Sequence, residues 1–160
     1  MKVKPSRALV MGLAAIVIVG ALALLLPVIG PSVIMPMMMG SVAPPTNLEL
    51  STTRVTENGL YQISYVPPEG GIRINQIHSW TLHVETADGQ PLSGALIRVD
   101  GGMPQHGHGL PTRPEVTQDL GQGDYLAEGL KFQMPGWWEV RFEIVAGEQT
   151  DLVTFNLVLP

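Results

Sequence analysis

The 160-residue chain contains no cysteine, and that absence excludes several classes of site at once. No disulfide can form, and cysteine proteases, thiol oxidoreductases, cysteine-bearing zinc sites and blue-copper sites all need a thiolate. A lipid anchor on a cysteine is excluded for the same reason. A metal ion in this protein must therefore be held by histidine, methionine or carboxylate side chains.

Charged side chains are also few. They make up 14% of the sequence, against about 25% in ordinary soluble domains, and residues 8–48 contain none. From residue 47 onward there are six basic and fourteen acidic residues, which gives a formal charge of −8. Because nucleic-acid binding needs a basic surface, nucleic acid is excluded as a partner of this region.

The longest uncharged apolar run extends from Ala8 to Leu26 and follows three basic residues, Lys2, Lys4 and Arg7. As a helix it spans about 28 Å, close to the roughly 30 Å hydrocarbon core of a bilayer. Positive charge before the run, with none directly after it, places the amino terminus in the cytoplasm. We therefore predict a cytoplasmic tip and a transmembrane anchor over residues 1–30. The rest of the chain then lies outside the cytoplasm, in the periplasm or at the cell exterior.

A cleaved secretory signal is the alternative for this amino-terminal region. Ser41-Val42-Ala43 offers small residues at a cleavable spacing, but Pro44 follows the cut and should hinder it. The apolar run is also longer than the roughly 7 to 15 residues usual in a signal peptide. We favour a retained anchor, and both alternatives leave the working domain outside the cytoplasm.

Residues 31–46 form a predicted tether that is rich in proline and methionine. The prolines exclude a continuous helix through it. Met35 and the run 37–39 have two interpretations: soft thioether ligands for Cu(I), or adaptable apolar side chains at the membrane edge. We favour the second.

The remaining segment, 47–160, has the pattern of strands separated by Gly/Pro/Asp turns. Tyr61, Ile63 and Tyr65 alternate on one face of a strand, and Trp80 and Leu82 begin a second such face. The predicted strands are 60–66, 79–85, 94–100, 124–132, 138–145 and 151–159, with weaker ones at 47–53 and 115–118. Seven or eight strands without a helical period predict an all-β fold, an antiparallel immunoglobulin-like β-sandwich.

Two motifs stand out within this segment. The first, GGMPQHGHGLPTRP (101–114), is predicted as a stiff loop, because its glycines and prolines suit neither a helix nor a regular strand. The second, KFQMPGWWEVRF (131–142), leads into the next-to-last strand. Because one short strand and one hairpin separate them, we expect the two motifs to meet at one end of the sandwich.

The two motifs, read as DGGMPQHGHGLPT (100–112) and LKFQMPGWWEVRFEI (130–144), resemble the FixH-like/YtkA-like family of exported β-sandwich domains. The resemblance extends over roughly residues 75–159. It implies a membrane-attached or secreted domain associated with copper handling or with respiratory and cytochrome systems. It implies no particular reaction.

The first motif is a candidate metal site. In an extended segment His106 and His108 point the same way, so both imidazoles can reach one ion. Met103 lies three residues upstream, and Met134 of the second motif can approach from the neighbouring strand end. Two imidazoles with one or two thioethers suit copper, and the thioethers favour Cu(I); zinc fits less well. The alternative is that these side chains stabilise turns and core or contact a partner protein.

The other two histidines and the carboxylates complete the list of candidates. We expect His78 and His83 to have surface or structural roles. Asp100 and Glu128 have no nucleophile paired with them, and no G-x-S-x-G, phosphate-loop or H-E-x-x-H motif occurs, so we predict that the protein is not an enzyme. Two hypotheses follow: a membrane-tethered copper carrier, buffer or assembly factor, or a non-metal module that docks on a membrane or respiratory redox complex.

Overall fold

The computed structural model describes residues 44–160. The predicted transmembrane anchor and almost all of the predicted tether, including its methionines, lie outside the described residues. Within the described range no helix is long and apolar enough to cross a membrane.

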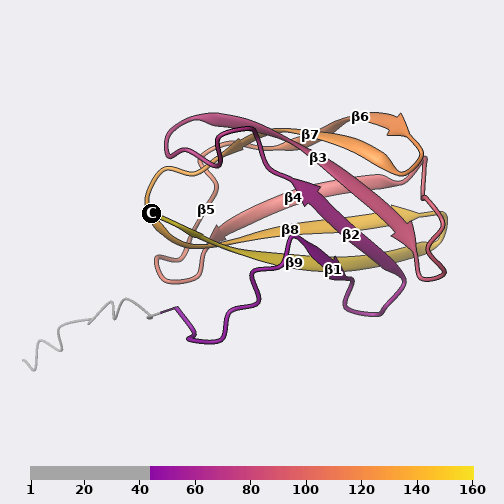
Figure 1. The fold of residues 1–160 in the computed structure, drawn as a ribbon, viewed down its shortest axis with the longest axis horizontal. Helices are drawn as coiled ribbons and strands as arrows, with labels where there is room; N and C mark the ends of the chain where they lie inside the picture. Colours follow the sequence, from indigo (N-terminus) through magenta and orange to yellow (C-terminus); the bar gives the residue numbers. More distant parts are fainter. Residues whose placement is uncertain (1–43) are drawn as a thin grey trace, which may run out of the picture. The chain divides into compact units, whose positions relative to one another are not determined.

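The described residues form two antiparallel sheets packed face to face, which confirms an all-β sandwich (Figure 1). One sheet has five strands in the order β1-β2-β3-β7-β6, and the other has four in the order β5-β4-β8-β9. The strands are β1 (Thr53–Val55), β2 (Tyr61–Val66), β3 (Ile77–Thr86), β4 (Leu96–Met103), β5 (His108–Gly109), β6 (Glu115–Gly121), β7 (Asp124–Lys131), β8 (Gly136–Ala146) and β9 (Gln149–Leu159).

The core lies between the sheets and follows the alternation of the sequence. In β3, Trp80 and Leu82 are fully buried, while His83 on the opposite face is partly exposed. Trp80 stacks on Tyr65 with ring centroids 4.5 Å apart, and Phe132 meets Trp138 edge to face at 5.3 Å. The faces predicted for β2 and β3 are therefore confirmed. Tyr65 of β2 also meets Phe155 of β9 edge to face at 5.0 Å, an aromatic contact between the two sheets.

The weak strand predicted at 47–53 is wrong. The first strand, β1, begins only at Thr53. Upstream of it, the Ser51 amide bonds the Glu49 carboxylate and the Thr53 amide bonds the Ser51 hydroxyl, at 2.9 and 3.1 Å. These local side-chain bonds occupy backbone groups that a ladder would need.

The prediction of a loop over the whole first motif is also wrong in part. β4 continues through Gly101 and Gly102 to Met103, and the chain then turns back to form β5. A Cβ on Gly101 would lie 2.6 Å from the Glu139 carbonyl oxygen, and one on Gly102 would lie 2.7 Å from the His108 carbonyl oxygen. In the sequence these glycines suggest a turn. In the structure they permit the close approach of β4 to its neighbouring strands.

A buried carboxylate ties the turn between β1 and β2 to the start of β9. Asp151 is 2% exposed and accepts hydrogen bonds from the Asn58 and Leu60 amides at 3.1 and 3.2 Å. Burial alone would raise the pKa of Asp151. Hydrogen bonds to its carboxylate outweigh burial and lower this pKa to about 2; the donors are the Thr56 side chain and the amides of Leu152, Asn58 and Leu60. The carboxylate therefore stabilises the fold in its charged form.

Candidate functional site

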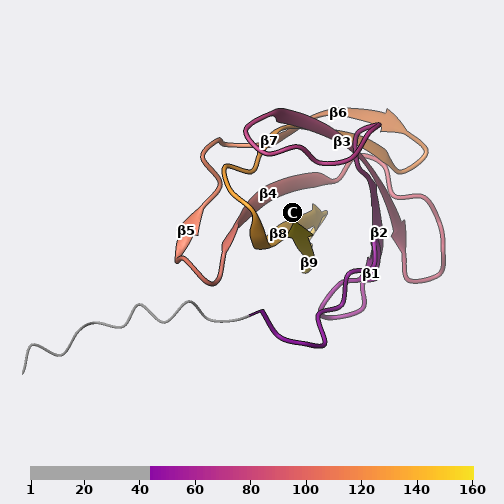
Figure 2. The same ribbon diagram turned by 60° about the vertical axis from the view of Figure 1, so that its left-hand side comes forward.

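The first motif folds into a short hairpin at one end of the sandwich (Figures 1 and 2). The amides of His106 and Gly107 both donate to the Met103 carbonyl oxygen, at 3.1 and 2.9 Å. Gly107 has a φ of 66°, a left-handed conformation that glycine adopts without strain. This turn brings the chain back so that His108 lies directly opposite Met103 in the β4–β5 ladder. Directly opposite residues project to the same face of a sheet, so the thioether and the imidazole are neighbours.

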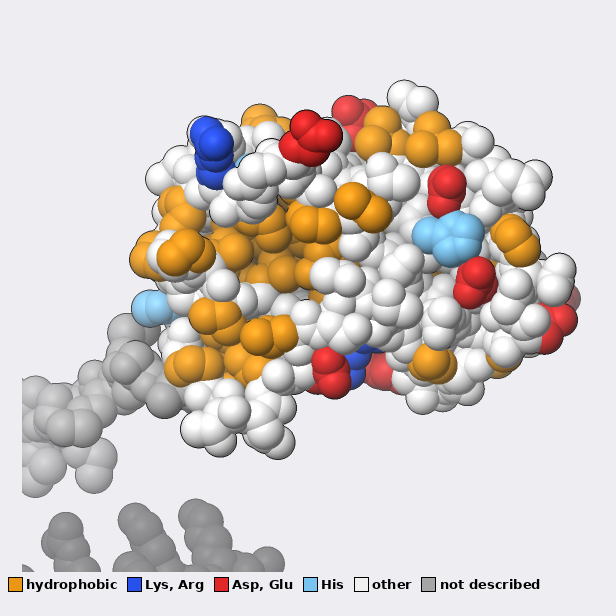
Figure 3. Space-filling view, in the orientation of Figure 1, with side chains coloured by type: hydrophobic (Ala, Val, Ile, Leu, Met, Phe, Trp, Pro, Cys, Tyr) orange, Lys and Arg blue, Asp and Glu red, His pale blue; other side chains and the backbone are white. Residues whose placement is uncertain are grey.

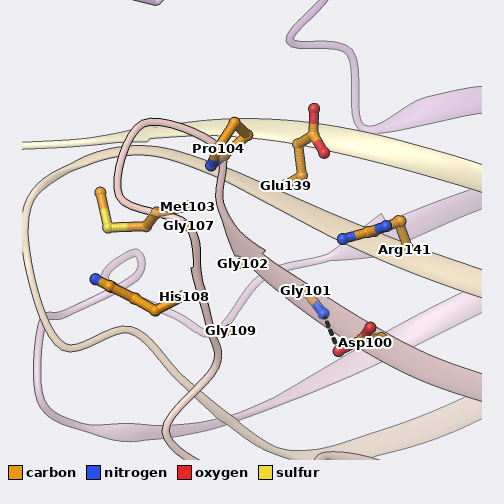
Figure 4. A pocket seen from close by; sticks show the side chains of 10 residues that line it. All are labelled: Asp100, Gly101, Gly102, Met103, Pro104, Gly107, His108, Gly109, Glu139 and Arg141. Atoms are coloured by element: carbon orange, nitrogen blue, oxygen red, sulfur yellow. Dashed lines mark hydrogen bonds between the residues drawn. The ribbon is translucent and has the colours of Figure 1, made fainter. Parts of the chain in front are cut away.

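Three rings form a row from solvent to core. The His106 and His108 rings stack with centroids 5.7 Å apart and planes 23° apart, and the His108 ring meets Trp138 edge to face at 6.1 Å. His106 is exposed, His108 is half-buried, and Trp138 is fully buried. Met103 is only 1% exposed, and Figure 4 shows its thioether beside the His108 ring. The candidate ligands therefore differ in depth.

The spacing of the two imidazoles is compatible with a shared ion. A ring nitrogen binds a transition metal at about 2.0 Å, which puts two ring centroids roughly 4.5 to 6.4 Å apart for ligand angles between about 90° and 180°. The observed 5.7 Å between His106 and His108 lies within that range. The spacing is therefore compatible with one shared ion, and binding of that ion by both imidazoles stays a prediction.

The second motif meets the first, as the sequence predicts. The Gln133 side-chain nitrogen lies 3.2 Å from Nδ1 of His108, and the Trp138 indole donates to the Met134 carbonyl oxygen at 3.0 Å. Met134 is partly buried and packs against the hydrophobic core. Of the two candidate thioethers, Met103 is the one whose neighbour across the ladder is a candidate histidine.

Gln133 is a site residue that the sequence analysis missed. Its side-chain oxygen Oε1 is buried and has no hydrogen-bond partner among the described residues. The sequence signal that could have indicated Gln133 is a polar residue between Phe132 and Met134 of the second motif, two side chains that pack into the core. A pattern within one segment does not reveal that this amide meets a histidine 25 positions earlier.

A hollow of about 330 Å³ lies beside the hairpin (Figure 4). Its lining is largely glycine backbone, with charged side chains from β4 and β8 on one side. The lining residues are Asp100, Gly101, Gly102, Met103, Pro104, Gly107, His108, Gly109, Glu139 and Arg141. The hollow therefore reaches the edge of the Met103–His108 pair.

Gly136 makes room for the Met103 thioether on the other side. A Cβ at residue 136 would lie 2.9 Å from the Met103 methyl carbon, and Gly136 has a φ of 120°. Any other residue there would be strained and would push against the methyl group. Gly136 of the second motif thus leaves space for the Met103 methyl group.

His78 and His83 lie outside this site. His78 is buried, and its Nε2 meets the backbone of Arg73 at 2.8 to 3.1 Å. His83 lies on the outer face of β3, with Nδ1 2.6 Å from Asp124 and Nε2 3.3 Å from Glu85. The hydrogen bond that the His83 ring donates to the Asp124 carboxylate is the main cause of a raised His83 pKa, against the lowering effect of burial. Both roles are structural, as expected.

Carboxylates do not complete a metal site at the hairpin. In residues 44–160 no three His, Asp or Glu side chains are grouped so that they could hold a metal ion. The candidate donors that the hairpin brings together are the two imidazoles and the Met103 thioether.

Comparisons with known proteins match the β-sandwich part of the chain. A family model described as YtkA-like matches residues 61–143, from β2 into β8, and this range includes both motifs. No curated protein matches the chain. Among solved structures, the chain is similar to the crystal structure of a DUF4426 family protein from Pseudomonas aeruginosa PAO1, with 12% identity and a TM-score of 0.48. That similarity covers 68% of this chain and 94% of the other.

Proposed function

Because the chain belongs to the YtkA-like family, we propose that its β-sandwich binds copper outside the cytoplasm, as a carrier, buffer or assembly factor. The observation that carries this proposal is the pairing of Met103 with His108 across the β4–β5 ladder, with the His106 ring stacked on His108. Nothing in the two motifs argues for a bond-making reaction, and we propose a binding role rather than an enzymatic one.

The donor set fits copper. His106 and His108 would supply imidazole nitrogens, and Met103, with Met134 as the alternative, would supply a soft sulfur. All of these donors are neutral, and the sulfur of Met103 is shielded from solvent. Such a set holds a soft monovalent cation well and a hard divalent one poorly, so the bound ion would be Cu(I).

The three candidate ligands are buried to different extents, and each would therefore have a separate role in binding. His106 is exposed and can meet an ion arriving from solvent or from another protein. His108 is half-buried and retains its position through contacts with Trp138 and Gln133. Met103 is the most buried of the three, in space that Gly136 leaves for its methyl group. Because the hairpin is fixed by the two bonds to the Met103 carbonyl oxygen, little ordering is needed on binding.

The order of strands supports an immunoglobulin-like topology within this proposal. β2-β3-β7-β6 and β4-β8-β9 follow the order of the ABED and CFG sheets of constant-type immunoglobulin domains. In that comparison the hairpin with His106 and His108 turns back from the end of strand C and pairs with it as β5, at the edge of the same sheet. Loops at the ends of such sandwiches commonly carry the binding site.

We further propose that a retained amino-terminal helix anchors this domain to the membrane. The support is the basic cluster of Lys2, Lys4 and Arg7 before the apolar run. A reporter enzyme fused after Pro160 would then be active only outside the cytoplasm, and extraction of the chain would need detergent. Recovery of a soluble chain beginning near Pro44 would contradict the anchor.

Copper titration of the purified full chain tests the function. The wild type should bind one Cu(I) more than the double variant His106→Ala/His108→Ala. This comparison subtracts any binding by Met35 or the methionines at 37–39, which both proteins contain.

Docking on a membrane or respiratory redox complex is the second candidate function, and one observation favours it. Hydrophobic side chains gather at the end of the domain that carries the hairpin (Figure 3). Val66, Ile77 and Val158 are 64%, 68% and 53% exposed. Equal copper binding by the wild type and the double histidine variant would favour docking on a partner as the role of the hairpin.

A further inference from the structure

Gln133 contacts a candidate ligand and yet leaves half of its own amide unpaired. Its nitrogen Nε2 lies 3.2 Å from Nδ1 of His108. Its oxygen Oε1 is buried and has no partner within residues 44–160. A buried amide oxygen without a partner is rare, because it has lost its hydrogen bonds to water and gained none in the protein.

The described orientation of this amide favours one tautomer of a neutral His108 ring. A neutral imidazole has one N–H donor and one acceptor nitrogen. With the Gln133 amide nitrogen facing Nδ1, the contact is a hydrogen bond when Nδ1 accepts, which puts the proton of a neutral His108 ring on Nε2. In this state neither nitrogen of His108 offers a free lone pair, since Nδ1 is engaged and Nε2 carries the proton.

A half-turn of the Gln133 amide about its last side-chain bond exchanges the positions of Nε2 and Oε1. Oε1 then faces Nδ1 and accepts a proton from it, so that Nε2 has a free lone pair. Metal-binding histidines usually donate their second ring N–H to such an acceptor, which orients the ring and raises its basicity. The ring proton leaves Nε2 for solvent and one is taken up at Nδ1, so the exchange releases no net proton.

We propose that Gln133 is a positioning residue that decides which nitrogen of His108 carries the proton, and thereby presents Nε2 to the ion. In the metal-free protein the amide donates to Nδ1. In the loaded protein the amide has rotated and Oε1 accepts the Nδ1 proton. The second half of this inference rests on the proposed copper site, whereas the first half does not.

The test is ¹⁵N NMR of histidine tautomers in the full chain, without metal and with Cu(I) under anaerobic conditions. The variants are Gln133→Glu, whose carboxylate can only accept a hydrogen bond, and Gln133→Leu, which does neither. Gln118→Glu is the matched control, because Gln118 is exposed on β6, in the sheet opposite the hairpin.

We expect the metal-free wild type and Gln118→Glu to carry the His108 proton on Nε2, and Gln133→Glu to carry it on Nδ1. With Cu(I), the wild type should move the proton to Nδ1. Gln133→Leu should bind Cu(I) about 10- to 100-fold more weakly, as is usual when a partner of a metal ligand is lost, and Gln133→Glu should retain affinity.

Two results would overturn the inference. One is a His108 tautomer in the metal-free protein that is the same for wild type and Gln133→Glu. The other is a Cu(I)-loaded wild type that keeps its proton on Nε2. A tautomer change with Gln133→Glu in a protein that binds no Cu(I) would support Gln133 as the group that sets the proton while rejecting the copper site itself.

Discussion

Met103 and His108 lie directly opposite each other across the β4–β5 ladder, so a buried thioether and a half-buried imidazole share one face of the hairpin. Their pairing depends on Gly101 and Gly102, which let β4 run close to both neighbouring strands, and on the turn at 104–107. A histidine and a methionine held in this way before binding are the basis of the proposed copper site.

Replacing the thioethers should distinguish the two oxidation states of copper. Met103→Leu should lower Cu(I) affinity by about tenfold or more, equivalent to about 1.4 kcal/mol, and should affect Cu(II) less. Leucine conserves the volume, so the fold should lose less than about 1.5 kcal/mol. Competition against a Cu(I) chelator measures the effect, and Met134→Leu is the matched variant. Equal losses for Cu(I) and Cu(II) would contradict a soft sulfur ligand.

Trp80→Ala should destabilise the domain by about 3 to 5 kcal/mol, because the ring is fully buried and stacks on Tyr65. Chemical denaturation gives the free energy of unfolding. Ile77→Ala on the same strand is the control; Ile77 is exposed, and its loss should change stability by less than about 0.5 kcal/mol. A change below about 1 kcal/mol for Trp80→Ala would mean that the ring contributes little to the core.

Asp151 should make the fold sensitive to acid. The pKa of Asp151 in the folded protein, about 2, is lower than the usual aspartate value. Its contribution to the free energy of unfolding is therefore complete above about pH 4. The contribution is lost as the pH falls from about 4 towards 2, since protonation removes the charged acceptor.

The variant Asp151→Asn puts an amide donor against the backbone donors of Asn58 and Leu60. It should destabilise the fold by about 1 to 3 kcal/mol at neutral pH, with a smaller difference from wild type at pH 2. Thermal unfolding across this pH range measures both effects. A difference that does not change with pH would contradict the charged-acceptor role.

The alternation of the sequence was sufficient to predict the sandwich and its core. In β2 and β3 every second side chain is large and apolar, and a one-residue shift would turn all of these residues outward. The end of β4 could not be predicted in this way. Gly101 and Gly102 have no side chains to alternate, and only the position of β8 and β5 explains why the strand continues through them.

The sequence proposes the residues of the candidate site, and the structure shows which of them lie together. The sequence indicates that His106 and His108 share a direction, and their rings do stack. It marks Gln133 only as a polar residue between two core side chains, because the contact with His108 depends on how the β7–β8 connection passes the hairpin. The ladder pairing of Met103 with His108 likewise follows from a turn that the prolines and glycines left ambiguous.

Cu(I) binding to the purified full chain, compared with the double variant His106→Ala/His108→Ala, tests the account most directly. Each single histidine variant should lower Cu(I) affinity by about tenfold or more, and the double variant should lose the hairpin site, with circular dichroism and thermal unfolding unchanged. His83→Ala, on the outer face of the other sheet, should bind as the wild type does. Equal Cu(I) binding by the wild type and a folded double variant would contradict the copper site.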